Sequence, residues 1–267
     1  MINSVDKDKR IFFFDIDKTL YDPEIKDFPE STKEALVKLT ANGHQIYIAT
    51  SRSESEMENV MDVIRPYDFT GFITCGGALT RVRGEIVDAV YMEPEDVKTV
   101  VEYCEEAGVD LRWQGLDEIY FCGEPSKFAV DTLMELFNKV PPVKQWNGEP
   151  VLRFLAYVTP QQREELQSRL KAVELVQLSE TVVDIMHEGI HKGSAMLHQA
   201  AREGFSREQI VAFGDGDNDT EMIAWAGTGI AMGNARNMPK EAADYVTTDI
   251  GENGIHNACA HFGWIAD

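Results

Sequence analysis

The chain has 267 residues, of which 43% are hydrophobic and 27% charged, so a folded globular protein with one large or two moderate domains is expected. Its formal net charge of −21 excludes general nucleic-acid binding, because that function needs a basic face. No run approaches the ~18 apolar residues of a membrane span, so we expect no membrane partner.

The first part of the chain alternates predicted strands and helices. The run Ile11–Phe14 is entirely apolar, which indicates a strand buried on both faces. Ser31–Glu34 fits a helix capping box, and the apolar stripe behind it predicts a helix that stops near Gly43. The next predicted elements are a strand over Gln45–Ala49, a second helix over Met57–Ile64 that Pro66 closes, and a short strand over Phe72–Thr74.

The middle of the chain, from about Val82 to Glu188, has a different pattern, with several short strands and fewer helices. Helices are predicted around Val97–Cys104 and Val130–Phe137, and Pro160 begins a third at its first turn. The pattern predicts a smaller α+β domain inserted into the first one. The predicted strands cover Ile86–Met92, Val109–Trp113, Glu118–Cys122, Val151–Val158, Glu174–Leu178 and Thr181–Met186.

The alternation returns after about Gly189, with a helix through Ala195–Ala201 and a strand over Ile210–Phe213. A helix through Met222 and a strand near Gly229–Met232 follow. Strands that alternate with helices predict a parallel sheet with right-handed crossovers. The expected fold class is therefore α/β: a Rossmann-like parallel-sheet core over residues 1–82 and 189–267, with an inserted α+β domain over residues 83–188.

Acidic side chains follow two of the predicted strands. Asp15 and Asp17 come directly after the first strand, and side chains at i and i+2 of an extended segment point the same way. Asp215, Asn218 and Asp219 follow the strand that ends at residue 213. Ligands in α/β folds bind outside the carboxyl ends of the strands, and oxygen ligands suit Mg²⁺ or Ca²⁺. The spacing does not fit an EF-hand, so the pattern favours Mg²⁺ between two strand ends, with an acidic turn as the alternative.

These motifs resemble those of the haloacid dehalogenase superfamily of phosphohydrolases. Asp15–Leu20 resembles the first motif, Asp-x-Asp-x-Thr/Val-Leu/Val, and Gly214–Asp219 resembles the fourth, Gly-Asp-Gly-x-Asn-Asp. Ile46–Thr50 resembles the second motif, and Lys192 resembles the third. The four motifs occur in the family's order, and the resemblance covers nearly the whole chain.

Two C-terminal segments narrow the resemblance to one branch of the superfamily. Ala231–Ala235 and Ala243–Val246 resemble the signature of the Cof-type branch, which carries a large inserted α/β cap of type IIB between the second and third motifs. The chain departs from that branch where Lys18 replaces a common Gly, Ser51 a usual Gly, and Cys75 a usual Asn.

The resemblance implies a role for each motif residue. Asp15 is the nucleophile, which becomes an aspartyl-phosphate, and Asp17 is the general acid and then the base. Mg²⁺ is held by Asp15, the backbone carbonyl of Asp17, and Asp215. Thr50 and Lys192 are further catalytic residues that bind the phosphate. The remaining candidates are Asn218 and Asp219, which support the metal site, and Asn234, which binds substrate or phosphate at the rim.

The expected activity is Mg²⁺-dependent hydrolysis of small phosphorylated metabolites, with sugar phosphates as the leading guess by analogy with the family. Two alternatives stay open: a phosphotransferase or phosphomutase on the same scaffold, and a non-enzymatic sensor of a phosphorylated metabolite. The sensor would more easily have lost Asp15 or Asp17. The inserted-domain residues that could contact the leaving group, or equally serve packing, are Arg112, Trp113, Tyr120, Trp146 and Arg153.

The four cysteines form no CxxC pair, and the first ten residues are too polar and charged for a signal peptide. We therefore expect a reduced, cytoplasmic protein. The histidines show no metal-ligand spacing and receive no chemical role. Nothing in the sequence predicts the oligomeric state.

Overall fold

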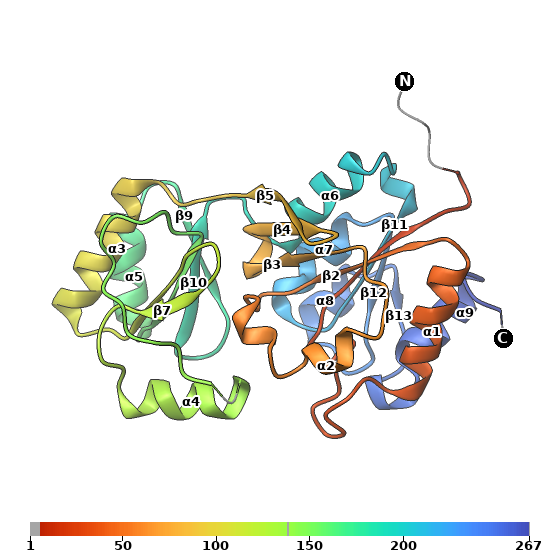
Figure 1. Ribbon diagram of the computed structural model, residues 1–267, viewed down its shortest axis with the longest axis horizontal. Coiled ribbons are helices and arrows are strands. Elements are labelled where there is room, and N and C mark those ends of the chain that lie inside the picture. Colours follow the sequence, from red (N-terminus) through yellow and green to blue (C-terminus); the bar gives the residue numbers. More distant parts are fainter. Residues whose placement is uncertain (1–5, 138, 267) are drawn as a thin grey trace. The chain divides into compact units, whose positions relative to one another are not determined.

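The computed structural model (Figure 1) describes residues 6–137 and 139–266, so residues 1–5, on which part of the signal-peptide argument rests, lie outside it. The chain forms two compact units. The first, here called the core unit, comprises Met1–Ser51, Val60–Val87 and His191–Asp267. The second, the inserted unit, comprises Arg52–Asn59 and Asp88–Ile190. None of the described helices is long and apolar enough to cross a membrane.

A mixed sheet forms the centre of the core unit. Its strands are β1 Ile11–Phe14, β2 Gln45–Ala49, β3 Gly71–Thr74, β4 Leu79–Val82, β5 Glu85–Ala89, β11 Ile210–Gly214, β12 Thr228–Ala231 and β13 Tyr245–Val246. In the described residues their order is β13-β12-β11-β1-β2-β3-β4-β5. Neighbours from β13 to β3 are parallel, whereas β3 and β4 are antiparallel. The predicted α/β fold with a parallel-sheet core is confirmed, with an antiparallel extension at one edge.

Helices cover both faces of this sheet. Their bounds are α1 Glu30–Ala41, α2 Met61–Ile64, α6 Lys192–Arg202, α7 Thr220–Trp225, α8 Asn237–Ala242 and α9 Gly254–His261. On one face Phe13 packs in a cluster with Met196 of α6 and Met222 of α7. On the other face the ring of Phe12 meets that of Trp264 edge-on, with centroids 5.0 Å apart. Because successive strand side chains point to opposite faces, both layers bury β1 completely, as its apolar run predicted.

The inserted unit has its own sheet and its own hydrophobic core. Its elements are β6 Leu111–Gln114, β7 Ile119–Phe121, β8 Arg153–Tyr157, β9 Val173–Gln177, β10 Val182–His187, α3 Pro94–Ala107, α4 Lys127–Phe137 and α5 Pro160–Arg169. The strand order is β7-β6-β8-β10-β9, with antiparallel neighbours, which confirms the predicted pairing of the last two strands. Trp113 of β6 packs with Val100 of α3 and Leu166 of α5. Its neighbours Arg112 and Gln114 therefore lie on the opposite face of the sheet.

The predicted capping box at Ser31 is wrong. Helix α1 begins one residue earlier, at Glu30, so Ser31 lies inside the first turn. Pro29 occupies the position before the helix, and no side chain caps the first turn there. Pro29 itself has a non-helical ψ of 145°, and the first turn carries Glu30, whose charge is favourable at a helix N-terminus.

The predicted continuous helix over Met57–Ile64 is also wrong. A short 3₁₀ turn covers Ser55–Met57, and α2 begins only at Met61. The reason is that the carbonyl of Glu56 accepts a hydrogen bond from the Arg52 guanidinium, at 3.0 Å, in a segment that belongs to the inserted unit. That packing overrides the helical spacing of the apolar residues.

Candidate active site

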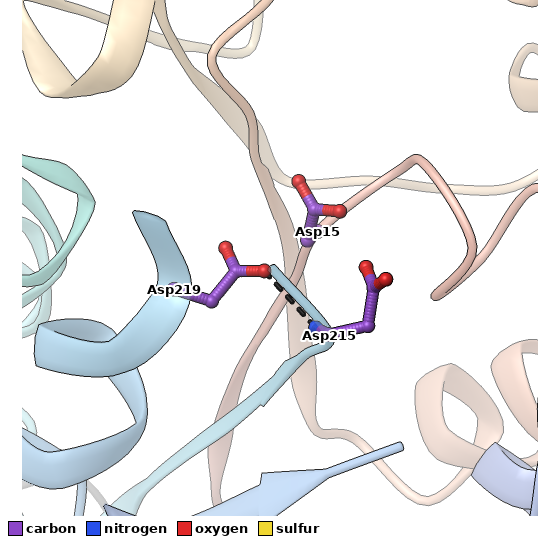
Figure 2. A group of neighbouring side chains, drawn as sticks. All are labelled: Asp15, Asp215 and Asp219. Atoms are coloured by element: carbon purple, nitrogen blue, oxygen red, sulfur yellow. Dashed lines mark hydrogen bonds between the residues drawn. The ribbon is translucent and has the colours of Figure 1, made fainter. Parts of the chain in front are cut away.

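The acidic residues of the site directly follow the carboxyl ends of two neighbouring central strands of the core sheet. Strands β1 and β11 pair in parallel with Phe14 opposite Phe213, so Asp15 and Asp215 follow at the same level. The amide of Asp15 donates to the carbonyl of Phe213 at 3.0 Å. Figure 2 shows the resulting group, in which carboxylate oxygens of Asp15, Asp215 and Asp219 lie within 4.8 Å of one another.

Lys192 joins two of these carboxylates. It opens α6, and its side chain is 2% exposed. Its Nζ lies 2.6 Å from Oδ1 of Asp15 and 2.7 Å from Oδ1 of Asp219. The other oxygen of Asp219 accepts a hydrogen bond from the amide of Asp215 at 3.0 Å (Figure 2). It also accepts from the amide of Gly216 at 2.9 Å. Asp219 is thus fixed at both oxygens and holds Lys192 in place, a supporting role.

The site carries more negative than positive charge. Burial, followed by the neighbouring Asp219, raises the pKa of Asp15 well above its ordinary value, and the Lys192 ammonium offsets part of this. Burial and Asp219 also raise the pKa of Asp215 to about 7. Burial alone would lower the pKa of Lys192, but the Asp15 and Asp219 carboxylates outweigh it and raise that pKa. We therefore assign the proton to the ammonium, between two carboxylates.

When all three carboxylates are ionised, they leave two negative charges in excess of the one ammonium, which is the charge that a divalent cation would neutralise. All the donors are oxygens, which suit a hard cation such as Mg²⁺. The hydroxyl of Thr19 donates a hydrogen bond to Oδ1 of Asp215 at 3.3 Å and so helps to orient this carboxylate. Thr19 lies in the motif Asp15–Leu20 but had no predicted role.

The end of strand β2 lies next in the sheet. Thr50 is 1% exposed, its amide donates to the carbonyl of Ile73 at 2.9 Å, and its carbonyl accepts from the amide of Gly76 at 3.1 Å. The side chain of Asn218 donates to Oγ of Ser51 at 2.8 Å. This bond ties the acidic loop after β11 to the end of β2, and it uses the hydroxyl of a residue that departs from the branch pattern.

The structure places two other predicted residues outside the carboxylate group. The side chain of Asp17 is exposed, and the cluster found among the described residues does not include it. Asn234 donates to the carbonyl of Lys18 at 2.9 Å and accepts from the amide of Ile250 at 2.8 Å, so it braces two loops. Lys18 has a φ of 60°, in the left-handed region that favours glycine, where the branch commonly has one.

The remaining expectations concern cysteines, histidines and the inserted unit. All four cysteines lie in the described part of the chain and form no disulfide. The ring of His191 accepts from the amide of Ser194 and so caps α6. Trp113 lies in the core of the inserted unit, and Arg112 and Arg153 are buried in ion pairs there.

Comparison with known proteins gives the same family as the motifs. A family model described as haloacid dehalogenase-like hydrolase matches residues 12–259. The chain belongs to this family. Among solved structures, the "HAD Subclass IIB Sugar Phosphatase BT4131" is similar with a TM-score of 0.89 and 30% identity, covering 96% of this chain and 100% of its own.

Two proteins of Bacillus subtilis (strain 168) are similar in sequence over almost their whole length. YkrA is 26% identical over 258 residues, which is 96% of this chain and 98% of that protein. The 5-amino-6-(5-phospho-D-ribitylamino)uracil phosphatase YitU is 26% identical over 261 residues, 90% of this chain and 93% of that protein. These matches confirm the superfamily, its type IIB branch and, at the level of the family, an enzyme of the phosphoric monoester hydrolase class.

Proposed function

We propose that this hydrolase is a Mg²⁺-dependent phosphatase of small phosphorylated metabolites and works through an aspartyl-phosphate intermediate. The observation that carries the proposal is the buried ammonium of Lys192, 2.6 Å from Asp15 and 2.7 Å from Asp219, beside the third carboxylate of Asp215. Lys192 favours the ionised form of Asp15 against the effect of burial and orients the carboxylate at a strand end, as a nucleophilic carboxylate requires.

The proposed chemistry takes place in two steps at this strand end. In the first, the Asp15 carboxylate attacks phosphorus in line, while Asp17 gives its proton to the leaving oxygen. In the second, Asp17 takes a proton from a water molecule, which attacks the same phosphorus and releases Asp15 and phosphate. The exposed side chain of Asp17 suits a group that must meet substrate and water. Thr50 and Lys192 would bind phosphate oxygens, and Asn234 would act at the rim.

The proposed Mg²⁺ ligands are Asp15, the backbone carbonyl of Asp17, and Asp215, with Asn218 and Asp219 in support. Enzymes of the family generally use a metal ion, and the excess negative charge of this oxygen-rich group fits one. When bound, the ion would neutralise charge on the carboxylates and on the phosphate. Asp219 is the least suited of the three acids to bind it directly, because Lys192 and two amides already occupy its oxygens.

We further propose sugar phosphates as the substrate class, supported by the similarity to a protein named a sugar phosphatase and to a phosphatase of a phosphoribityl compound. The inserted domain, predicted over residues 83–188, would serve as the cap that selects the leaving group, with residues 1–82 and 189–267 as the catalytic core. The cysteine thiols support a cytoplasmic location.

Phosphate release from a panel of phosphomonoesters, measured with Mg²⁺ or with EDTA, tests the proposal. The intact protein should turn over at least one ester only with metal, and Asp15→Asn should abolish that turnover. The ranking of sugar phosphates within the panel tests the substrate class. Transfer of phosphate to a second sugar would indicate the transferase alternative. Binding of a phosphorylated metabolite without release of phosphate would indicate the sensor.

A further inference from the structure

The segment Arg52–Asn59 belongs to the inserted unit, although the chain on both sides of it belongs to the core unit. The chain therefore enters the inserted unit twice, first for these eight residues and again for Asp88–Ile190. The predicted inserted domain, residues 83–188, does not contain this short segment. The segment begins two residues after Thr50, which makes its attachment relevant to the candidate active site.

Glu56 is the residue that fastens the segment. Its side chain is 6% exposed. Its Oε1 accepts from Arg112 of β6 at 2.7 Å, and its Oε2 accepts from Arg153 of β8 at 3.1 Å. The amide and hydroxyl of Ser53 donate to the same Oε2, at 2.9 Å and 3.1 Å. The carboxylate thus links the turn of its own segment to two adjacent strands.

The surrounding charges are balanced and buried. Arg153 also donates to Asp184 of β10 at 2.7 Å, so two acids and two arginines form a chain of ion pairs across β6, β8 and β10. Although burial opposes ionisation, the two arginines hold the pKa of Glu56 below its usual range. Neutralising Glu56 would leave Arg112 without its carboxylate in a buried place, whereas Arg153 would keep Asp184.

Other contacts of the segment support the same attachment but are weaker. The guanidinium of Arg52 lies 5.2 Å from the ring centroid of Phe137, at the end of α4. Glu58 pairs with Lys139 at 2.9 Å, but both side chains are exposed, and exposed pairs contribute little. Glu58 is therefore a matched control, because it is an acid on the same segment that also pairs with a residue of the inserted unit, but its ion pair is exposed.

The upstream end of the segment continues directly into the site. Ser51, the last residue before it, accepts the hydrogen bond of Asn218 from the acidic loop at 2.8 Å. The backbone of Ser51 leads within two residues to Ser53, whose amide and hydroxyl donate to Glu56. A loosened segment would weaken the bond from Asn218 to that hydroxyl, which is one of the contacts of the loop that carries Asp215 and Asp219.

We propose that Glu56 is a positioning residue for the hydrolase: by fastening Arg52–Asn59 to Arg112 and Arg153, it holds the Ser51–Asn218 contact beside the aspartate group. The kinetic test of this inference rests on the proposed phosphatase function, but its exchange test does not. If Glu56 only stabilised the inserted unit, its substitution would lower the unfolding temperature, but its effect on kcat would not depend on Ser51.

The test compares Glu56→Gln, Glu58→Gln, Ser51→Ala and the double variant Glu56→Gln/Ser51→Ala, below the unfolding temperature of each. For the best phosphomonoester of the panel, kcat should fall roughly 10- to 100-fold in Glu56→Gln, the size expected when reacting groups are misplaced. Glu58→Gln should stay within about threefold of the unaltered protein. The fall in kcat of the double variant should be no larger than that of the more impaired single variant, because both substitutions interrupt the same path from Glu56 through Ser51 to Asn218.

Amide hydrogen exchange gives a readout that needs no activity. Glu56→Gln should speed exchange in residues 50–59 and also in the acidic loop, residues 214–219, and Glu58→Gln should not. If Glu56→Gln does not fold, Glu56→Asp, which keeps the charge but shortens the side chain, replaces it. If the kinetic losses multiply in the double variant, or the acidic loop exchanges unchanged, the inference is overturned. If no ester is hydrolysed by any variant, the phosphatase proposal fails, and exchange in the acidic loop still decides the role of Glu56.

Discussion

A divalent metal should stabilise this protein more at alkaline than at acidic pH. Burial and neighbouring carboxylates raise the pKa of Asp215 to about 7, and they raise the pKa of Asp15 as well. Between the ordinary carboxyl pKa near ~4 and these raised values, the metal-free folded protein binds more protons than the unfolded chain. Its free energy of unfolding therefore falls as pH rises through that window.

The size of the effect follows from Asp215 alone. Moving the pKa of one carboxyl from its ordinary value to about 7 costs about 4 kcal/mol once the pH is well above 7. Asp15 acts in the same direction. Mg²⁺ bound between the carboxylates would remove most of this cost, since it favours their ionised forms. The increase in the free energy of unfolding on adding Mg²⁺ should therefore be small near pH ~5 and larger by up to about 4 kcal/mol at pH ~8. This difference corresponds to several degrees in unfolding temperature.

Thermal unfolding with MgCl₂ or with EDTA, at a series of pH values and matched ionic strength, measures this difference. Asp215→Asn is the informative variant, because it removes one of the repelling carboxylates without changing the shape of the side chain. The metal-free variant should be more stable than the metal-free parent at alkaline pH, and its gain from Mg²⁺ should be smaller. If Mg²⁺ stabilised the protein equally at all pH values, or more at acidic pH, then repulsion among the buried carboxylates would not be the cause of the stabilisation.

Three further changes test single contacts. Asp15→Asn keeps an oxygen that can accept from Lys192 and removes a buried carboxylate with a raised pKa, so in EDTA it should unfold at a temperature no lower than the parent, but it should lose at least about 10³-fold in kcat by phosphate release. Lys18→Gly should raise the free energy of unfolding in urea by up to about 1 kcal/mol, since the φ of 60° strains a residue with a side chain; no gain would contradict that strain. Gly214→Ala would place a Cβ 2.5 Å from the Cβ of Asp219, so about 1–3 kcal/mol of stability and most of the activity should be lost.

The strands that carry the site could be predicted because their sequence signals are local. A run of four apolar residues at Ile11–Phe14 and the apolar segment Gln45–Ala49 gave both strands with their observed bounds. Helix α9 was not predicted, although Asn253 before it is a residue type common at helix starts; in the structure Asn253 has a left-handed backbone and its side chain makes no cap hydrogen bond. The two-residue strand β13 is too short for any periodic pattern to reveal.

The contacts within the site were less accessible to sequence reasoning. The adjacency of β1 and β11 is a property of the sheet order; the acids that follow the two strands favoured a cation between strand ends, and the family resemblance added the role of each acid. The bond from Thr19 to Asp215 joins residues 196 positions apart, and no local spacing encodes it. Glu56 is a similar case, because its two arginine partners lie on strands of the inserted unit.

The charge of the whole chain adds a constraint on how such a site can work. A net charge of −21 repels phosphate esters at long range, so attraction must arise locally. Lys192 is the buried cation of the site, but its charge is already shared between two carboxylates at 2.6 Å and 2.7 Å. An ammonium so placed orients Asp15 more than it attracts a dianion. We infer that phosphate binding by this protein depends on a divalent cation, and that the acidic site is arranged to acquire that cation first.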